Sequence, residues 1–342
     1  MPKLRVLHLV GSAQDDFHGD LSRLYAQSCL TATADTARYE YHIAYVTPDC
    51  CWRFPVSLSD TDIAAAEPMY LADAIATLEA KNIDVALPQM FCIPGMTQYR
   101  SLLDLIGIPY AGNAAEVMTL TADKAKTKAI VAAAGIKVPY GELLRPGDMP
   151  TLRPPVVIKP TNADNSMGVT FVDDMANYDA ALANAFRYAS EVLVETYIEL
   201  GREVRCGILC QGDRLVGLPL EEYGVSETDH PIRGYADKLK RDASGTLGFA
   251  AKEKDKSWIV TPTDPITERV HAIAKQCHQA LGCRHYSLFD FRIDAQGQPW
   301  FLEAGLYCSF SPYSVVSTMA RAADMPLPEL LRTAIAQALS ER

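Results

Sequence analysis

The sequence predicts an α/β protein whose N-terminal part holds a parallel sheet and whose later parts hold antiparallel hairpins. Over residues 4–112, short apolar runs alternate with segments of helical periodicity, which is the pattern of βαβ units. Later in the chain, paired apolar runs at residues 155–172 and 287–304 are each joined by a polar turn, as in hairpins. The 342 residues are 49% hydrophobic, which is enough for about two or three domains with buried cores.

Composition narrows the classes of function. The formal net charge is −10 and the pI is about 5.2, so we expect no nucleic-acid partner and no anionic membrane surface as partner. No run of about 18 apolar residues is present, and the N-terminus lacks the apolar segment of a signal peptide. The nine cysteines, including the vicinal pair Cys50 and Cys51, show no zinc-ligand spacing. Reduced thiols and a cytoplasmic location are therefore expected.

The N-terminal elements alternate between strand and helix. The expected strands are residues 4–10, 41–46 and 85–88, and the expected helices are residues 21–32, 64–80 and 102–106. Ligands of parallel sheets bind outside the carboxyl ends of the strands, which places loops 11–20 and 89–98 at a binding edge. Candidates for substrate contacts in these loops are Asp15, Asp16, His18 and Gln89. Ordinary solvated loop polarity is the alternative explanation for each of them.

Three lysines gather at the start of a helix that is expected to follow Thr121. Thr121 can cap this helix, and Asp123 favours its first turn. Lys124, Lys126 and Lys128 oppose the helix dipole at this end, so at least one of them is expected to face an anion. The alternative is that all three lysines are solvated.

A second lysine motif lies in residues 155–172. An apolar strand ends at Lys159, a polar loop of small residues follows, and a second strand begins near Val169. Small loop residues allow backbone N–H groups to approach phosphate oxygens, and the lysine adds a point charge. An ordinary hairpin with a surface lysine is the alternative.

The middle of the chain adds further elements and one long polar segment. The expected elements are a helix at residues 178–188, strands at 191–195, 203–209 and 214–220, and a helix at 266–281. Residues 221–257 are polar and are expected to be irregular, which is typical of a functional or disordered segment. Lys238, Lys240 and Arg241 suit a mobile loop over phosphates, with a merely solvated loop as the alternative.

Two acidic residues are expected to face each other across a hairpin at residues 287–304. Asp290 lies in the first apolar strand and Glu303 lies in the second, so both can project from one face. Mg²⁺ is commonly held by one or two carboxylates together with phosphate oxygens. The sequence therefore predicts a divalent-cation site here, and an exposed acidic pair is the alternative.

In this order, the parts resemble an ATP-grasp enzyme of the D-alanine–D-alanine ligase type over essentially the whole chain. The resemblance rests on residues 122–124, residues 157–160 with the loop to Gly168, Glu195 with Glu203, and Asp290 with Glu303. It implies an ATP-grasp fold with an N-terminal parallel α/β substrate domain at residues 1–118. Two α+β subdomains would follow and clamp ATP, a lid at 119–196 and a metal and substrate subdomain at 197–342.

The resemblance also implies a role for each site residue. ATP would be bound by Lys124, Lys159, Ser166, Glu195, Tyr197, Ile198, Glu203, Lys238 and Leu302. Among these, Glu195 would accept from the adenine amino group and Glu203 would hold the ribose. Mg²⁺ would be bound by Asp290 and Glu303, and catalysis would use Lys159, Lys238 and Arg292. A homodimer acting on small-molecule substrates is implied as well.

Several positions depart from the pattern of the resembled family. Gly305 stands where a metal-binding Asn is usual, which leaves the number of metal ions open. Leu288 stands where an Arg usually stabilises the oxyanion of amide formation, and Arg292 is a candidate replacement. The positions that fix a first D-alanine match the Asp15–Asp16 region, Asn165 and Leu239, so that clamp is absent as such. Ser314 matches the serine that holds the second substrate's carboxylate.

One subfamily resembles the chain more closely, namely the MysD-type ligases of mycosporine-like amino acid biosynthesis. The resemblance rests on residues 7–12, 87–96 and 303–306. It implies ATP-dependent joining of mycosporine-glycine to an amino acid such as serine or threonine, although which amino acid is left open. The alternatives are a dipeptide ligase that uses carboxylate substrates, a nucleotide-binding protein without catalysis, and a non-enzymatic interaction protein.

Overall fold

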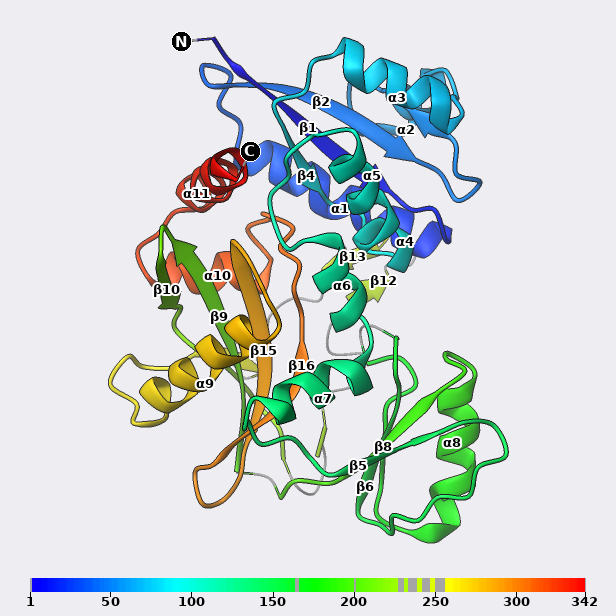
Figure 1. Ribbon diagram of the computed structural model, residues 1–342, viewed down its shortest axis with the longest axis vertical. Coiled ribbons are helices and arrows are strands. Elements are labelled where there is room, and N and C mark those ends of the chain that lie inside the picture. The colour runs from blue at the N-terminus through cyan, green and yellow to red at the C-terminus, as the bar shows by residue number, and fades with distance from the viewer. Residues whose placement is uncertain are drawn as a thin grey trace.

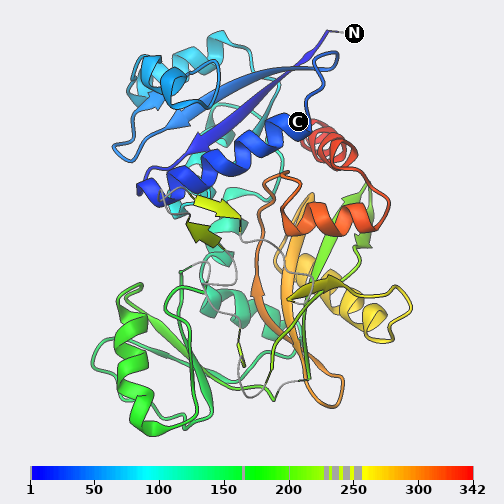
Figure 2. The same ribbon diagram turned by 180° about the vertical axis from the view of Figure 1, so that it is seen from behind.

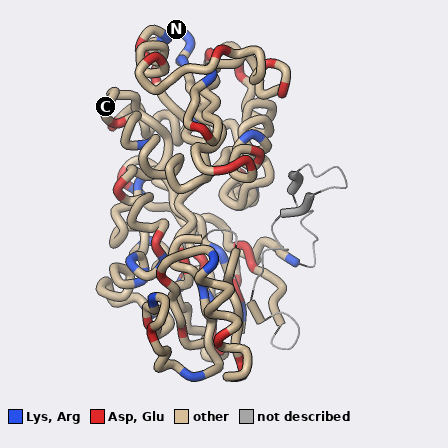
Figure 3. The backbone as a smooth tube through the Cα atoms, turned by 90° about the vertical axis from the view of Figure 1, so that its right-hand side faces the viewer, with Lys and Arg blue, Asp and Glu red and all other residues tan. Residues whose placement is uncertain are grey.

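The structure is a computed structural model whose described residues form three larger sheets, one two-stranded sheet and the helices packed on them (Figure 1). It describes residues 2–163, 166–199, 201–226, 231–232, 239–241, 247–249 and 256–341, with the backbone alone for 239–241 and 247–249. No helix in these described ranges is long and apolar enough to cross a membrane. All nine cysteines are free thiols. Acidic and basic residues are interspersed along the described chain (Figure 3).

The N-terminal sheet is built mainly from parallel strands, as the alternating pattern predicts. Its strands are β1 (Leu4–Gly11), β2 (Tyr39–Val46), β3 (Trp52–Arg53) and β4 (Val85–Pro88), in the order β3-β2-β1-β4. Strand β1 runs parallel to both β2 and β4. The helices of this part are α1 (Asp16–Ala32), α2 (Asp60–Ala65), α3 (Leu71–Ala80), α4 (Ile93–Met96) and α5 (Gln98–Leu105).

The single helix expected at residues 64–80 is wrong, because two helices occupy this region. The chain is extended from Ala66 to Tyr70, and Met69 forms an isolated bridge with Trp52. Pro68 explains the break, since proline lacks the N–H that a helix needs and disfavours helical geometry at the residue before it.

The central part combines two helices with a four-stranded antiparallel sheet. The helices α6 (Ala115–Thr121) and α7 (Lys124–Ala133) precede β5 (Gly141–Leu144), β6 (Val156–Pro160) and β7 (Thr170–Val172). A short 3-10 helix, η1 (Met175–Asn177), then leads into α8 (Tyr178–Phe186) and β8 (Val192–Thr196). The sheet order is β5-β8-β6-β7, and its apolar face packs on α8 through Tyr178, Ala181 and Ala185.

The C-terminal sheet is antiparallel and is built around two long strands, β9 (Arg202–Gln211) and β15 (Tyr286–Ile293). Its other strands are β10 (Arg214–Gly217), β11 (Glu221–Tyr223), β14 (Ser257–Ile259) and β16 (Pro299–Ala304). The order is β14-β11-β9-β15-β16, and β10 pairs with β9. Helices α9 (Ile266–Ala280), α10 (Val315–Ala322) and α11 (Leu327–Ser340) complete this part.

The segment 221–257 is not irregular throughout, which corrects the expectation from its polarity. Strand β11 extends the C-terminal sheet, and β12 (Leu239–Arg241) pairs with β13 (Leu247–Phe249) in a separate two-stranded sheet. Backbone pairing of this kind depends on neighbouring strands more than on side-chain hydrophobicity, so the composition alone did not reveal it.

Shared hydrophobic cores connect the C-terminal part to both other parts. Helix α11 lies between the N-terminal and C-terminal sheets in both views (Figures 1 and 2), and its Leu331 and Ile335 share a core with Val6 of β1. Helix α7 packs on β16, with Val131 and Phe301 in one core. Each fully buried side chain of this size contributes about 1.5–3 kcal/mol. Helix α7 is thereby fixed between the central and C-terminal sheets.

Candidate active site

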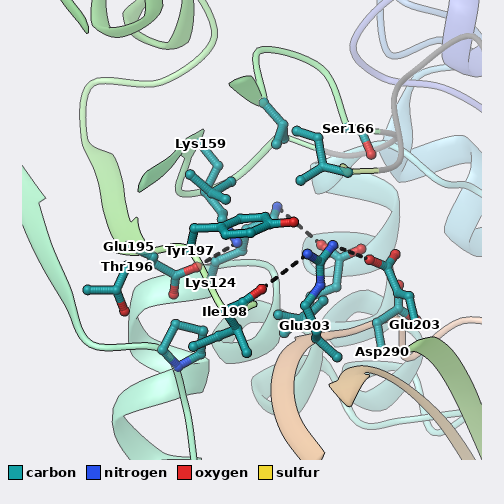
Figure 4. Close-up of a pocket in the computed structure, with 16 residues that line it drawn as sticks. Lys124, Lys159, Ser166, Glu195, Thr196, Tyr197, Ile198, Glu203, Asp290 and Glu303 are labelled. Carbon is teal, nitrogen blue, oxygen red and sulfur yellow. Dashed lines mark hydrogen bonds and ion pairs between the residues drawn. The ribbon is translucent and has the colours of Figure 1, made fainter. Parts of the chain in front are cut away.

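A pocket lies between the central sheet and the C-terminal sheet, at the edge of α7 (Figure 4). Residues from β6, β8, β15, β16 and the segment after β8 contribute to its wall. The lining consists of Lys124, Pro139, Val157, Lys159, Ser166, Val169, Glu195, Thr196, Tyr197, Ile198, Glu203, Ile232, Asp290, Arg292, Leu302 and Glu303. This set includes every described residue that the sequence assigned to nucleotide or metal. Lys238 and Asn165 lie outside the described residues, and Leu239 is described by its backbone alone.

One side of the pocket holds a buried group that we call the lysine cluster, formed by Lys128, Lys159 and Glu195. Glu195 at the end of β8 is 2% exposed and forms ion pairs with both ammonium groups. Lys159 Nζ lies 2.6 Å from Glu195 Oε2, and Lys128 reaches the other carboxylate oxygen from α7. Two cations therefore share one anion, and the cluster has a net positive charge.

Burial and pairing act in opposite directions on the protonation of the lysine cluster. Burial lowers the pKa of Lys128 to about 8, although the charge of Glu195 opposes that change. Burial also acts to raise the pKa of Glu195, but the charges of Lys128 and Lys159 lower it below its usual value. Glu195 is thus ionised, and it is bound to lysines in addition to lining the pocket where adenine recognition was expected.

Helix α7 begins with a cap that directs two of its three lysines inward. The Asp123 carboxylate accepts hydrogen bonds from the N–H groups of Ala125 and Lys126, so Asp123 is the N-cap. Lys124 Nζ donates to the carbonyl oxygen of Ala163 at 2.6 Å and lies 4.0 Å from Glu303 Oε2. Lys126 instead points outward, where it pairs with Asp123.

Thr121 does not cap this helix, which corrects the sequence prediction. Its hydroxyl donates to the carbonyl oxygen of Val117 at 2.8 Å, because Thr121 is the last residue of α6. The expectation that at least one lysine at the start of α7 faces an anion is confirmed, since Lys128 pairs with Glu195.

The opposite side of the pocket is lined by Asp290 and Glu303, and Arg205 pairs with Asp290 from the neighbouring strand without lining the pocket itself. We call these three charged residues the acidic row. The register of the sheet pairs Asp290 with Arg205 of β9 on one side and with Glu303 of β16 on the other. Directly paired residues project from the same face of an antiparallel sheet. The predicted placement of Asp290 and Glu303 on adjacent strands is therefore confirmed.

The donor set of the acidic row fits Mg²⁺ held jointly with phosphate. Asp290 is 8% exposed and Glu303 is partly exposed. Both line the pocket, so a cation in the pocket can contact their carboxylates. The described residues contain no group of three or more His, Cys, Asp or Glu side chains that could hold a metal by themselves. Mg²⁺ commonly takes one or two carboxylates and completes its shell with phosphate oxygens and water, which matches this pair.

Arg292 lies on the nucleotide side of the pocket. The sequence had made it a candidate to replace the oxyanion-stabilising arginine that is missing at position 288. Its Nη2 donates to Glu203 Oε2 and to the carbonyl oxygen of Pro231, each at 2.8 Å. Its guanidinium also stacks over Tyr197, 5.1 Å from the ring centroid. These contacts bind Arg292 to the segment after β8, so it is a poor replacement for an oxyanion-stabilising arginine.

The predicted substrate residues of the N-terminal loops serve largely structural roles. Gln89 is fully buried; its Oε1 lies 2.7 Å from His8 Nδ1 and its Nε2 donates to the carbonyl oxygen of Ser309. Burial lowers the pKa of His8 to about 4, so this ring is neutral near pH 7. Gln89 thus connects β4 to the C-terminal part, and its contact with substrate stays a prediction.

Asp15, Asp16 and Ser314 lie at helix starts. Asp15 caps α1 by accepting from His18 N–H at 2.8 Å and from the His18 ring at 2.7 Å. Asp16 is the first residue of α1. Ser314 caps α10, accepting from Ser317 N–H and donating to Ser317 Oγ at 2.7 Å. Their substrate roles stay predictions.

Two functional features escaped the sequence analysis. Lys128 was one of three equivalent lysines, and only the packing of α7 distinguishes it. Arg205 was not predicted as a site residue. It lies two residues after Glu203 in β9, so the two side chains share one face of this largely apolar strand. That period of two is the signal that could have placed both side chains on the pocket face.

Comparison with known proteins identifies the family of the chain. The family profile of the D-ala D-ala ligase C-terminus matches residues 148–336. A D-alanine–D-alanine ligase of Nocardia farcinica is 30% identical over 94% of this chain and 95% of its own. The VanG D-Ala:D-Ser ligase of Enterococcus faecalis superposes with a TM-score of 0.78 at 20% identity, covering 98% of this chain and all (100%) of that one.

The D-alanine–D-alanine ligase of Bacillus anthracis complexed with ATP has a TM-score of 0.70 at 21% identity, covering 99% and 98% of the two chains. The chain belongs to the D-alanine–D-alanine ligase family. It is thus an ATP-grasp ligase with ATP and Mg²⁺ as its cofactors, and the expected fold is confirmed. The domain boundaries, the homodimer and the MysD resemblance stay predictions.

Proposed function

We propose that this chain is an ADP-forming ligase that phosphorylates a carboxylate oxygen of one small substrate and joins that substrate to the amine of another. The observation that supports this most directly is the opposite charge of the two pocket sides. The lysine cluster and Lys124 suit phosphate oxygens, whereas Asp290 and Glu303 suit a divalent cation between those phosphates. Such an arrangement favours phosphoryl transfer from a metal–nucleotide complex.

Under this proposal, different residues of the pocket wall would contact different parts of ATP. Tyr197, Ile198 and Leu302 offer apolar contact to a base, and Glu203 offers a carboxylate to ribose hydroxyl groups. Lys124 and Lys159 place ammonium charges where phosphates would lie. Asp290 and Glu303 would hold Mg²⁺, which when bound would neutralise charge on the transferring phosphoryl group.

The comparisons favour a dipeptide-type carboxylate–amine ligase, because the named relatives are D-Ala:D-Ala and D-Ala:D-Ser ligases. D-Alanine is nevertheless not expected to be the preferred first substrate here. Asn165 and Leu239 lack the hydroxyl groups with which the family fixes the first D-alanine. A site that depends on such hydrogen bonds discriminates by orders of magnitude when they are missing.

A second candidate is the ligation of mycosporine-glycine to serine or threonine, favoured by Leu288 and Gly305. Its acceptor oxygen belongs to a ketone conjugated to an enamine, and it attacks phosphorus as a carboxylate oxygen does. The amine then adds to the ring carbon and phosphate leaves, giving an imine. This route forms no tetrahedral carboxyl oxyanion, which is consistent with the loss of the family's arginine at position 288.

One experiment distinguishes the two candidates. The protein is incubated with ATP, Mg²⁺ and pairs of substrates, and ADP is measured by a coupled assay while products are weighed by mass spectrometry. ADP formation that requires a pair of amino acids, without mycosporine-glycine, supports the first candidate. ADP formation that requires mycosporine-glycine and an amino acid, with a shift of absorbance to longer wavelength, supports the second. No ADP with any carboxylate, mycosporine-glycine or amine would overturn the proposed function.

A further inference from the structure

Among the described residues, Arg205 is the arginine whose guanidinium contacts a proposed metal ligand, Asp290. Its Nε lies 2.6 Å from Asp290 Oδ1 and its Nη2 donates to Asp290 Oδ2 at 2.8 Å, so the pair is bidentate. The Arg205 side chain is 14% exposed, and its guanidinium lies over the ring of Tyr223 at 5.5 Å. A strand position, a carboxylate and an aromatic ring together fix its orientation.

The surroundings of Arg205 connect the acidic row to the N-terminal part. Burial raises the pKa of Tyr25 in α1 to about 12, and the charge of Arg205 opposes this rise. Tyr25 packs edge-on against Phe91, which in turn packs against Tyr307. The rings of Tyr25, Phe91 and Tyr307 thus connect the N-terminal part to the segment after β16, and the charge of Arg205 acts on the Tyr25 hydroxyl of this group.

Of the described residues, those at the two other candidate positions, 292 and 288, do not offer a cation to Asp290. Arg292 is bound to Glu203 and to backbone oxygens on the nucleotide side. Position 288 lies on the same face as Asp290, two residues earlier in β15, but it holds a buried leucine. A Cβ added at Gly305 would lie 3.9 Å from that leucine, so the neighbour of Gly305 at this point is an apolar side chain and not a cation.

We infer that Arg205 is a catalytic and substrate-binding residue whose guanidinium contacts the acceptor oxygen that receives the γ-phosphoryl group, an inference that rests on the proposed function. The acceptor oxygen bonds to the γ-phosphorus, and the bond from that phosphorus to the β–γ bridging oxygen breaks with its electron pair leaving on ADP. The amine then bonds to the activated carbon, phosphate leaves with the carbon–oxygen electron pair, and the amine proton passes to solvent. Arg205 stabilises the oxygens that bear negative charge in both steps.

The position of Arg205 explains how the site works without an arginine at position 288. A guanidinium on β9 approaches Asp290 from the neighbouring strand, whereas one at position 288 would approach along β15. Both reach the same face of the sheet, so the charge is supplied from a different strand. Pairing with Asp290 also keeps Arg205 in place before substrate binds, which lowers the cost of ordering it.

The test compares Arg205→Gln and Arg205→Lys with a matched control, Arg202→Gln. Arg202 lies on the same strand and is paired with Glu222 and Asp264, so its loss removes an ion pair that does not involve Asp290 or Glu303. We expect Arg205→Gln to lower kcat for ADP formation by about 10²-fold, with KM for ATP changed by less than about threefold. The kcat of Arg205→Lys should lie between those of wild type and Arg205→Gln, since an ammonium group keeps the charge but lacks the bidentate geometry. Arg202→Gln should retain kcat.

A second measurement needs no acceptor and thus separates this inference from the proposed function. Orthovanadate with Mg²⁺ and ADP mimics the transferring phosphoryl group, and its binding is measured by calorimetry. We expect Arg205→Gln to weaken the affinity for ADP with vanadate by at least about tenfold, and the affinity for ADP alone by little. Equal vanadate affinity in wild type and variant overturns the inference. Wild type without turnover on any acceptor, but with Arg205-dependent vanadate binding, overturns only the proposed function.

A double variant tests the exchange of strands directly. Arg205→Gln combined with Leu288→Arg returns a guanidinium to the face of Asp290 from β15. We expect this double variant to turn over at least about tenfold faster than Arg205→Gln alone. A second double variant, Leu288→Arg with Arg292→Gln, tests whether Arg292 on the nucleotide side of the pocket contributes to this recovery. Wild-type turnover in Arg205→Gln, or a matching loss in Arg202→Gln, contradicts the assignment.

Discussion

The lysine cluster and the acidic row form the two sides of one pocket and carry opposite net charge. The lysine cluster joins two ammonium groups to one carboxylate, whereas the acidic row joins one guanidinium to two carboxylates. In each group the minority charge offsets the cost of burying its partners, and the excess charge faces the pocket. The difference shows that the site is complementary to a metal–nucleotide complex rather than to a lone anion or a lone cation.

The two groups also differ in how the fold assembles them. The acidic row is set by the register of three neighbouring strands, so backbone hydrogen bonds fix its spacing. The lysine cluster draws on α7, β6 and β8, and its geometry depends on the packing of a helix against two sheets. We therefore expect substitutions in the lysine cluster to affect stability most, and those in the acidic row to affect turnover most.

The largest expected effect on stability comes from Glu195→Gln. This change leaves two buried ammonium groups without a carboxylate, and breaking a buried ion pair in this way costs about 3–5 kcal/mol. The free energy of unfolding is measured by urea titration. Glu191→Gln is the matched control, because Glu191 adjoins β8 and pairs with the exposed Arg145. That variant should lose less than about 1 kcal/mol. Equal losses would mean that the lysine cluster adds little to stability.

The largest expected effect on turnover comes from Glu303→Gln. A carboxylate that holds Mg²⁺ during phosphoryl transfer is worth several kcal/mol, so ADP formation should fall by about 10²-fold or more. Nucleotide binding should be partly retained, because Lys124 and Lys159 remain in the pocket. Steady-state kinetics and calorimetry with ADP measure the two quantities. Turnover like that of wild type would remove Glu303 from the proposed metal site.

The acidic row shows what the sequence can predict. Asp290 and Glu303 lie on two strands joined by a tight turn, so their pairing follows from local alternation and turn position. The parallel N-terminal sheet follows likewise from the alternation of strands and helices. Such features depend on neighbours in the chain, and the periodicity of side chains encodes them.

The features that the sequence analysis missed depend on residues that are distant in the chain. Gln89 is a polar residue in a loop, yet it is buried because His8 and Ser309 satisfy its amide from two other segments. Lys128 differs from Lys126 only in the direction in which α7 presents it. Single-residue chemistry gives no hint of either outcome, since packing decides which polar groups are buried.

A smaller effect is expected from pH through Lys128. Its pKa is lowered to about 8 by burial, whereas the unfolded chain keeps an ordinary lysine. Between pH 8 and the ordinary lysine pKa of the unfolded chain, the unfolded state binds more protons than the folded state. Lys128 therefore makes the free energy of unfolding rise with pH in this range, by at most about 1.4 kcal/mol per pH unit. The measurement is the difference in unfolding free energy between wild type and Lys128→Met at pH 7, 8 and 9. A difference that does not change with pH contradicts the assigned burial.

The smallest effect tests how α7 delivers its cations to the positive side of the pocket. Asp123→Ala removes the cap that accepts from two backbone N–H groups, so stability should fall by about 1 kcal/mol. Because α7 presents both Lys124 and Lys128, fraying of its first turn should also weaken ADP binding a few-fold. Lys126→Ala is the matched control, since it removes only the exposed ion pair with Asp123 and should cost less than about 0.5 kcal/mol. Thermal unfolding and calorimetry with ADP measure both variants. If Lys126→Ala weakens ADP binding as much as Asp123→Ala, the exposed charge, and not the orientation of α7, governs nucleotide affinity.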